Sequence, residues 1–178
     1  MMRSYLIALA GSATLIVGCA PMDDGATSAA AAAAGDATPE ERTAYVAMAG
    51  SSDLYEIQSG QLAQQKAQRD ELRQFGQMLV QHHTQTTQQV MSAARSAGMN
   101  PPPPSLTPMH RRMLDDLQQA SGAAFDNLFV RQQIQAHEMA LGLHQNYARN
   151  GDAPPLRTAA NSAVPIITQH LERARQLD

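Results

Sequence analysis

Two adjacent histidines, His82 and His83, lie in the stretch QMLVQHHTQTTQQV, whose composition predicts the middle of a helix. Successive residues of an α-helix point about 100° apart, so only one of these two imidazoles can face the interior. A buried neutral imidazole can bind a transition metal, or it can simply hydrogen-bond a hydroxyl or a carbonyl inside the core. The residues that share a face with each histidine therefore decide which of the two deserves a chemical interpretation.

Spacings of three, four and seven residues place His83, and not His82, on the apolar face of this helix. The residues that share a face with His83 are Leu72, Phe75, Leu79, Val90 and Ala94. The residues that share a face with His82 are Glu71, Met78, Gln85 and Gln89. We therefore expect His83 to be buried and His82 to be a surface residue outside any site.

Each of the other long predicted helices carries one comparable residue. His137 shares its face with Val130, Ile134 and Leu141, and His170 lies with Ala163, Ile166 and Ile167. The first helix has no histidine, but it places Glu56 on a face of small residues. Counted along the helices, these residues fall near one level of a bundle. The sequence therefore predicts a metal site built from Glu56, His83, His137 and His170.

Three imidazoles and one carboxylate can form a four-coordinate site for Zn, Cu, Fe, Mn or Ni. A buried carboxylate without a partner is costly, and a divalent cation would offset that cost. His144, seven residues after His137, is a secondary candidate, either as a ligand or as a partner of one. The alternative is that each histidine is a neutral core residue bonded to a hydroxyl, for which Thr84, Thr87, Tyr55 and Tyr147 are available.

Other residues carry weaker signals. Met109 and Met113 flank His110 at helical spacing, which suits either a soft metal or the packing of a short amphipathic helix. Asp126 and Glu138 are lesser metal candidates. No nucleophile–base arrangement, phosphate-binding loop or nucleotide motif is apparent, so the sequence names no catalytic residue.

The elements that must position these side chains are four long helices and one short one. The predicted ranges are about 39–68, 70–97, 109–119, 125–149 and 154–177. Thr38 and Pro39 are the expected cap and first residue of the first helix, and Pro165 should kink or break the last. The long connection over 98–124 fits a crossover. We therefore predict an all-α, ferritin-like four-helix bundle with a short extra helix between the second and third long helices.

The N-terminal residues suggest a bacterial lipoprotein. Arg3 precedes a short apolar run that ends at "IVGC", which resembles a lipobox whose Cys19 becomes lipidated. We therefore expect a signal peptide over 1–19, a low-complexity tether over 20–38 and the bundle over 39–178. Ala20, rather than Asp, after the cysteine resembles outer-membrane sorting with the domain facing the periplasm. Without lipidation, the expected product is a secreted or periplasmic protein.

Composition removes several classes of function. The net charge is −3 with 16% charged residues, so nothing in the composition suggests a nucleic-acid partner, which would require a basic face. Cys19 is the only cysteine, so the chain forms no internal disulfide and the mature domain has no thiolate chemistry. The absence of Trp, with 4% aromatic residues, favours helices over a β-sandwich.

The segments that contain these residues resemble a bacterial family of domains of unknown function, DUF4142. The resemblance covers about residues 45–177 and includes "YEIQSGQLAQQKAQRDELRQFGQMLVQHHTQTTQQV", "FDNLFVRQQIQAHEMAL" and "VPIITQHLERARQL". It implies a secreted or outer-membrane protein with a ferritin-like fold, and it implies site positions at Glu56, His83, His137 and His170. His82 departs from the family pattern, which more usually has an acidic or another polar residue there. The paired Glu-x-x-His motifs of di-iron ferritins are absent, so iron storage is not supported.

Three functional hypotheses follow from the sequence. The first is an envelope lipoprotein that binds a transition-metal ion for metal handling or envelope stress. The second is a metal-dependent redox enzyme that acts on peroxide or oxygen species, with Glu56 as ligand or base. The third is a metal-free structural or interaction protein of the envelope. Metal content separates the third hypothesis from the other two.

Overall fold

The computed structural model describes residues 39–178, and this part of the chain contains helices and no strands. The predicted signal peptide, Cys19 and the tether lie outside the described residues. The helices are α1 (Arg42–Lys66), α2 (Asp70–Ser96), α3 (Pro108–Gln119), α4 (Gly122–Asn150) and α5 (Pro154–Leu177). Within residues 39–178, no helix combines the length and the apolar character needed to cross a membrane.

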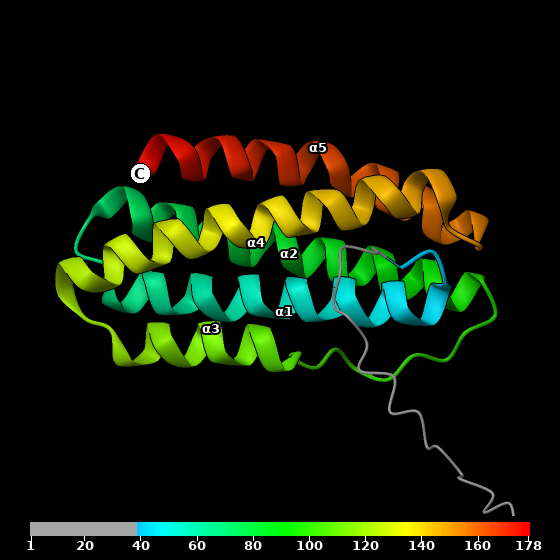
Figure 1. The fold of residues 1–178 in the computed structure, drawn as a ribbon, viewed down its shortest axis with the longest axis horizontal. Helices are drawn as coiled ribbons and strands as arrows, with labels where there is room; N and C mark the ends of the chain where they lie inside the picture. Colours follow the sequence, from blue (N-terminus) through cyan, green and yellow to red (C-terminus); the bar gives the residue numbers. More distant parts are fainter. Residues whose placement is uncertain (1–38) are drawn as a thin grey trace, which may run out of the picture. The chain divides into compact units, whose positions relative to one another are not determined.

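The four long helices form a bundle in which α1 packs against α2, α2 against α5, α5 against α4, and α4 against α1. Short turns join α1 to α2 and α4 to α5, so each of these pairs is antiparallel (Figure 1). Between α2 and α4, the chain returns along the outside of the bundle through α3, which packs mainly against α1. As a result α4 runs in the same direction as α2 (Figure 1).

The prediction of an all-α bundle with a short helix in the long connection is confirmed. The predicted start of the first helix was wrong, because Pro39 is not helical and the cap is Glu41. The Glu41 carboxylate accepts hydrogen bonds from the backbone N–H groups of Thr43 and Ala44. Of the two effects expected of Pro165, a kink or a break, the break is excluded, since α5 continues through it. Pro165 is exposed, so the carbonyl that loses its intrahelical partner faces the solvent side.

Two glycines allow α1 and α2 to approach closely. A Cβ atom added to Gly60 would lie 2.6 Å from the carbonyl oxygen of Gly76, and the reciprocal distance is also 2.6 Å. Both obstacles are backbone atoms of rigid helices, so neither can move aside without separating the helices. This contact sets how tightly the first pair of helices packs, and that pair carries Glu56 and His83.

We expect Gly76→Ala to destabilise the protein by about 1–3 kcal/mol, because the new methyl group would force α1 and α2 apart. Gly142→Ala is the matched control, since a Cβ there meets no atom within 4 Å. On an exposed stretch of helix that change should stabilise the protein by about 0.5–1 kcal/mol. Urea unfolding followed by circular dichroism measures both values. Equal effects of the two substitutions would contradict the role assigned to the glycine contact.

The core consists of two larger apolar clusters with polar residues between them. The cluster toward the α1–α2 turn contains Leu72, Phe75, Leu79, Phe125 and Phe129. The cluster at the opposite end contains Tyr45, Val90, Ala94, Tyr147 and Leu156. Along α2, His83 falls between the two sets, and His137 does so along α4. The polar centre is therefore enclosed by apolar packing at both ends.

Candidate metal centre

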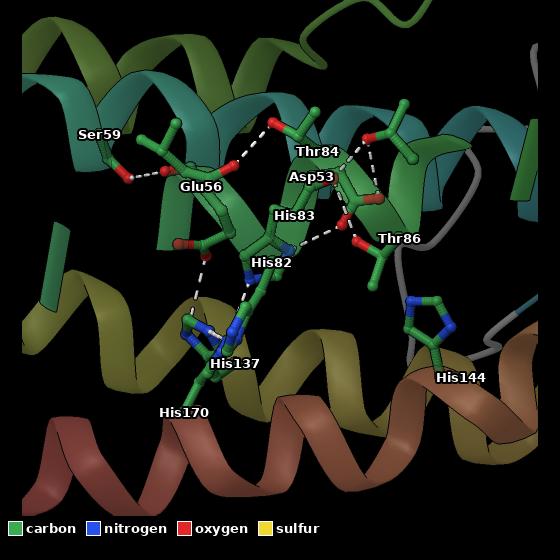
Figure 2. Close-up of polar contacts among 12 residues, drawn as sticks. Asp53, Glu56, Ser59, His82, His83, Thr84, Thr86, His137, His144 and His170 are labelled. Carbon is green, nitrogen blue, oxygen red and sulfur yellow. Dashed lines mark hydrogen bonds and ion pairs between the residues drawn. The ribbon is translucent and has the colours of Figure 1, made fainter. Parts of the chain in front are cut away.

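Three histidines from three different helices converge at the middle of the bundle. His83 on α2 is 1% exposed, and His137 on α4 and His170 on α5 are fully buried. One ring nitrogen from each residue lies within 4.8 Å of the other two, and this is the one such group of potential ligands among residues 39–178. Figure 2 shows the three rings meeting from α2, α4 and α5.

Two of the three separations between the inward nitrogens match those around a single bound ion. His170 Nδ1 lies 3.2 Å from His83 Nε2 and 3.3 Å from His137 Nε2. Nitrogens that bind one zinc ion at about 2.0–2.1 Å in a tetrahedral arrangement lie roughly 3.3–3.4 Å apart. Three lone pairs directed at one another repel unless a proton or a metal ion lies between them. The arrangement therefore has the spacing and the chemistry of a three-imidazole metal site.

Outward hydrogen bonds orient two of the three rings. His83 Nδ1 lies 2.8 Å from Asp53 Oδ1, and the other carboxylate oxygen of Asp53 accepts a hydrogen bond of 3.0 Å from Thr87 Oγ1. His137 Nδ1 lies 2.8 Å from the backbone carbonyl oxygen of Gln133. Because both partners are acceptors, each Nδ1 carries a proton, so in the neutral form of each ring Nε2 presents a lone pair to the centre. Outer partners of this kind typically orient the histidines that bind metals.

Burial controls the protonation of the centre. Burial lowers the pKa of His137 to about 3 and that of His170 to about 2, so both rings are neutral at neutral pH. For His83, burial lowers the pKa, but the hydrogen bond and the charge of Asp53 outweigh it and raise the pKa overall. A metal ion at this centre would therefore compete with a proton on His83 and not with protons on all three rings.

Glu56 reaches the edge of this centre from α1. Its Oε1 lies 3.7 Å from His137 Nδ1, the outer nitrogen of that ring (Figure 2). The carboxylate oxygens lie outside the group of inward ligand atoms, and neither accepts a hydrogen bond from the described residues. Burial raises the pKa of Glu56 to about 8. The predicted fourth ligand is therefore buried beside the three histidines, next to an outer nitrogen.

The expectation that His82 is a surface residue outside the site was wrong. Its Nδ1 lies 2.8 Å from His170 Nε2, and the two rings are nearly parallel, with their centroids 5.1 Å apart and 13° between their planes. His82 is half-buried, because α5 packs over the side of α2 that the sequence pattern marks as polar. The sequence pattern of one helix shows which of its sides is polar, but it does not show which neighbouring helix will cover that side.

The remaining candidates lie elsewhere. His144 is buried, but it is outside the ligand group, and its Nδ1 lies 3.0 Å from the Tyr45 hydroxyl. His110 Nδ1 lies 2.7 Å from Ser51 Oγ, so this ring has a structural partner in α1. Asp126 accepts hydrogen bonds from the backbone N–H groups of Gln68 and Arg69, at the α1–α2 turn. Glu138 is exposed and pairs with Arg175 on α5.

Sequence reasoning missed Asp53 and Gln133 as partners of the histidines. Asp53 could have been identified from the sequence, because it lies one helical turn before Glu56 and therefore shares its buried face. Gln133 contributes through its backbone carbonyl, which any residue would provide, so its identity carries no signal for this contact.

Comparisons with known proteins agree with the fold. The model of a family described as "Domain of unknown function (DUF4142)" matches residues 26–177. A search of curated protein sequences finds no match. Among solved structures, CopM in the Cu(II)-bound form has a TM-score of 0.64 and 20% identity, over 76% of this chain and 94% of that chain. CopM in the Ag-bound form has a TM-score of 0.63 and 20% identity, over 76% and 93% of the two chains.

Proposed function

This chain belongs to the DUF4142 family, and we propose that it binds a transition-metal ion through His83, His137 and His170 as a metal-handling protein. The observation that carries the proposal is the convergence of three imidazole nitrogens within 4.8 Å at a buried centre. Burial keeps His137 and His170 neutral, which is the form that binds metals.

The donor set indicates a class of metal ions and not a single element. Imidazole suits Zn, Cu, Fe and Ni, whereas Ca²⁺ and Mg²⁺ prefer oxygen ligands. Copper is the first choice of this class, because structures with the same fold hold Cu(II), Cu(I) or Ag. The N-terminal lipid anchor at Cys19 and an outer-membrane location facing the periplasm remain part of this proposal as predictions from sequence.

Glu56 is a second carboxylate beside this site, in addition to Asp53, which is bonded to His83. Three neutral imidazoles contribute no charge to offset that of a bound cation in a buried centre, so nearby carboxylates stabilise the ion. We propose that the ionised Glu56 balances the charge of the ion, either through space or as a fourth ligand after rotation of its side chain. His144 lies on the same face of α4 as His137, but its ring is bonded to Tyr45, so we do not propose it as a ligand.

The test is the metal content and thermal stability of protein purified without a histidine tag. After separate reconstitution with Zn²⁺, Cu⁺, Cu²⁺, Fe²⁺, Mn²⁺ and Ni²⁺, we expect one ion per chain for at least one of the nitrogen-preferring metals. An ion at about 100 times its Kd should stabilise the fold by about 2.7 kcal/mol. Protein that remains metal-free with every ion, and whose Tm does not change, would refute the proposal.

A further inference from the structure

His170 differs from the other two histidines in the nitrogen that faces the centre. His83 and His137 present Nε2 and are held from outside through Nδ1, whereas His170 presents Nδ1. The outward nitrogen of His170 is therefore Nε2. Its hydrogen-bonding partner is not a carboxylate or a carbonyl but the Nδ1 of His82, at 2.8 Å.

We propose that His82 is the positioning residue that fixes His170 in the tautomer that binds metal. This inference rests on the proposed function. When His170 Nδ1 gives its lone pair to an ion, the single ring proton must sit on Nε2. That N–H points at His82 Nδ1, which accepts it if the proton of the neutral His82 ring is on Nε2. Without an acceptor there, a buried N–H would be left unbonded, at the cost usual for an unsatisfied donor.

The surroundings of His170 strengthen this assignment. The ring is fully buried, and Phe75 lies edge-to-face with it at 6.4 Å, so an apolar ring covers part of it. His82 is half-buried at the seam between α2 and α5, and the plane of its ring lies within 13° of that of His170, which suits a hydrogen bond in the plane of both rings. His82 thus supplies two separable things, namely an acceptor atom and a flat ring.

Two substitutions separate these contributions. In His82→Asn, the side-chain amide oxygen can occupy the place of Nδ1, so the acceptor is kept and the ring is lost. In His82→Phe, the ring is kept and the acceptor is lost. We expect Asn to bind within about threefold of the wild-type affinity, and Phe to bind about 10–100-fold more weakly, the usual effect of removing an outer partner of a metal-binding histidine.

The measurement is competitive titration of Cu⁺ and Zn²⁺ against a chelator, with the whole folded protein in each case. Both ions are diamagnetic, so ¹⁵N–¹H spectra of the loaded protein also report which nitrogen of His170 carries the proton. We expect Nε2 protonation in the wild type and in His82→Asn, and a loss of that single state in His82→Phe. Circular dichroism of the metal-free variants checks that each one folds.

The possible outcomes are distinct. Wild-type protein that binds neither ion refutes the proposed function, and the positioning role falls with it. Wild-type protein that binds an ion, with His82→Phe binding equally well, refutes only the positioning role. Equal weakening in His82→Asn and His82→Phe also refutes it, because the ring and not the acceptor would then matter. Rescue by Asn together with failure of Phe supports it.

Discussion

Protein carrying His137→Ala is expected to bind no transition-metal ion under conditions that load the wild type with one ion per chain. His137 is fully buried, and its Nε2 lies 3.3 Å from His170 Nδ1 at the centre of the ligand group. Removing it leaves two imidazoles, His83 and His170, where the wild type presents three. We expect affinity to fall by at least about 10³-fold, more than the effect of removing an outer partner, as measured by chelator competition.

His144→Ala is the matched control for this experiment. It removes a second buried histidine from the same face of α4, seven residues further along, and it also creates a cavity. Its ring bonds Tyr45 and lies outside the ligand group, so metal affinity should stay close to that of the wild type. If both variants lose metal binding equally, the loss reflects damage to α4 and the assignment of His137 as a ligand fails.

The second large effect is expected at Glu56, where replacing the carboxylate by an amide should stabilise the metal-free protein at neutral and alkaline pH. The Glu56 carboxyl group is fully buried and neither oxygen is hydrogen-bonded by the described residues. Burial raises its pKa from the ordinary 4.5 to about 8. The unfolded chain therefore releases this proton in a pH range where the folded protein still holds it.

The sign of the pH dependence follows from this difference in bound protons. Between pH 4.5 and about 8 the folded state binds more protons at Glu56 than the unfolded state does, so the free energy of unfolding falls as the pH rises. At about 1.4 kcal/mol per pH unit, the full loss is on the order of 4–5 kcal/mol above that range. Glu56→Gln removes this loss, because an amide does not ionise.

Urea unfolding in the presence of a chelator, at pH values near 4.5, 6 and 8, measures the effect. The difference in unfolding free energy between Glu56→Gln and the wild type should be small at the lowest pH and should increase as the pH rises. Glu138→Gln is the control, because Glu138 is an exposed carboxylate whose ion pair with Arg175 contributes little. A difference that does not depend on pH would mean that Glu56 does not carry a raised pKa.

The same substitution tests the role of Glu56 toward the ion. If the carboxylate balances the charge of a bound cation, Glu56→Gln should weaken metal binding while it stabilises the metal-free fold. A variant with higher stability and lower affinity would show that the unpaired carboxylate is retained for binding. Unchanged affinity would leave the three histidines as a complete site and would remove Glu56 from it.

The faces of the helices were predictable from the sequence, because the 3.6-residue period of a helix is a local property. That period alone placed Glu56, His83, His137 and His170 on the buried side, and all of them are buried in the structure. The number of helices, the short helix in the connection and the turns were predictable for the same reason, since Gly, Asn and Pro end helices through local backbone geometry.

The partners of those residues were not predictable, because they depend on how one helix is rotated and shifted against another. His82 lies on a polar flank in the sequence pattern, yet the packing of α5 brings it within 2.8 Å of His170. Asp126 resembled a lesser metal ligand, but it bonds the backbone of the α1–α2 turn, far along the chain.

Periodicity along single helices thus specified an all-α bundle and a short set of buried polar residues. It could not specify which nitrogen of each imidazole faces the centre, that Asp53 and the Gln133 carbonyl hold two of the rings, or that Glu56 meets an outer nitrogen. Those facts depend on how closely particular side chains on different helices approach one another, and a shift of about 1 Å would exchange one partner for another. Only the packed bundle sets such distances, because one rotation about a helix axis changes all of them together.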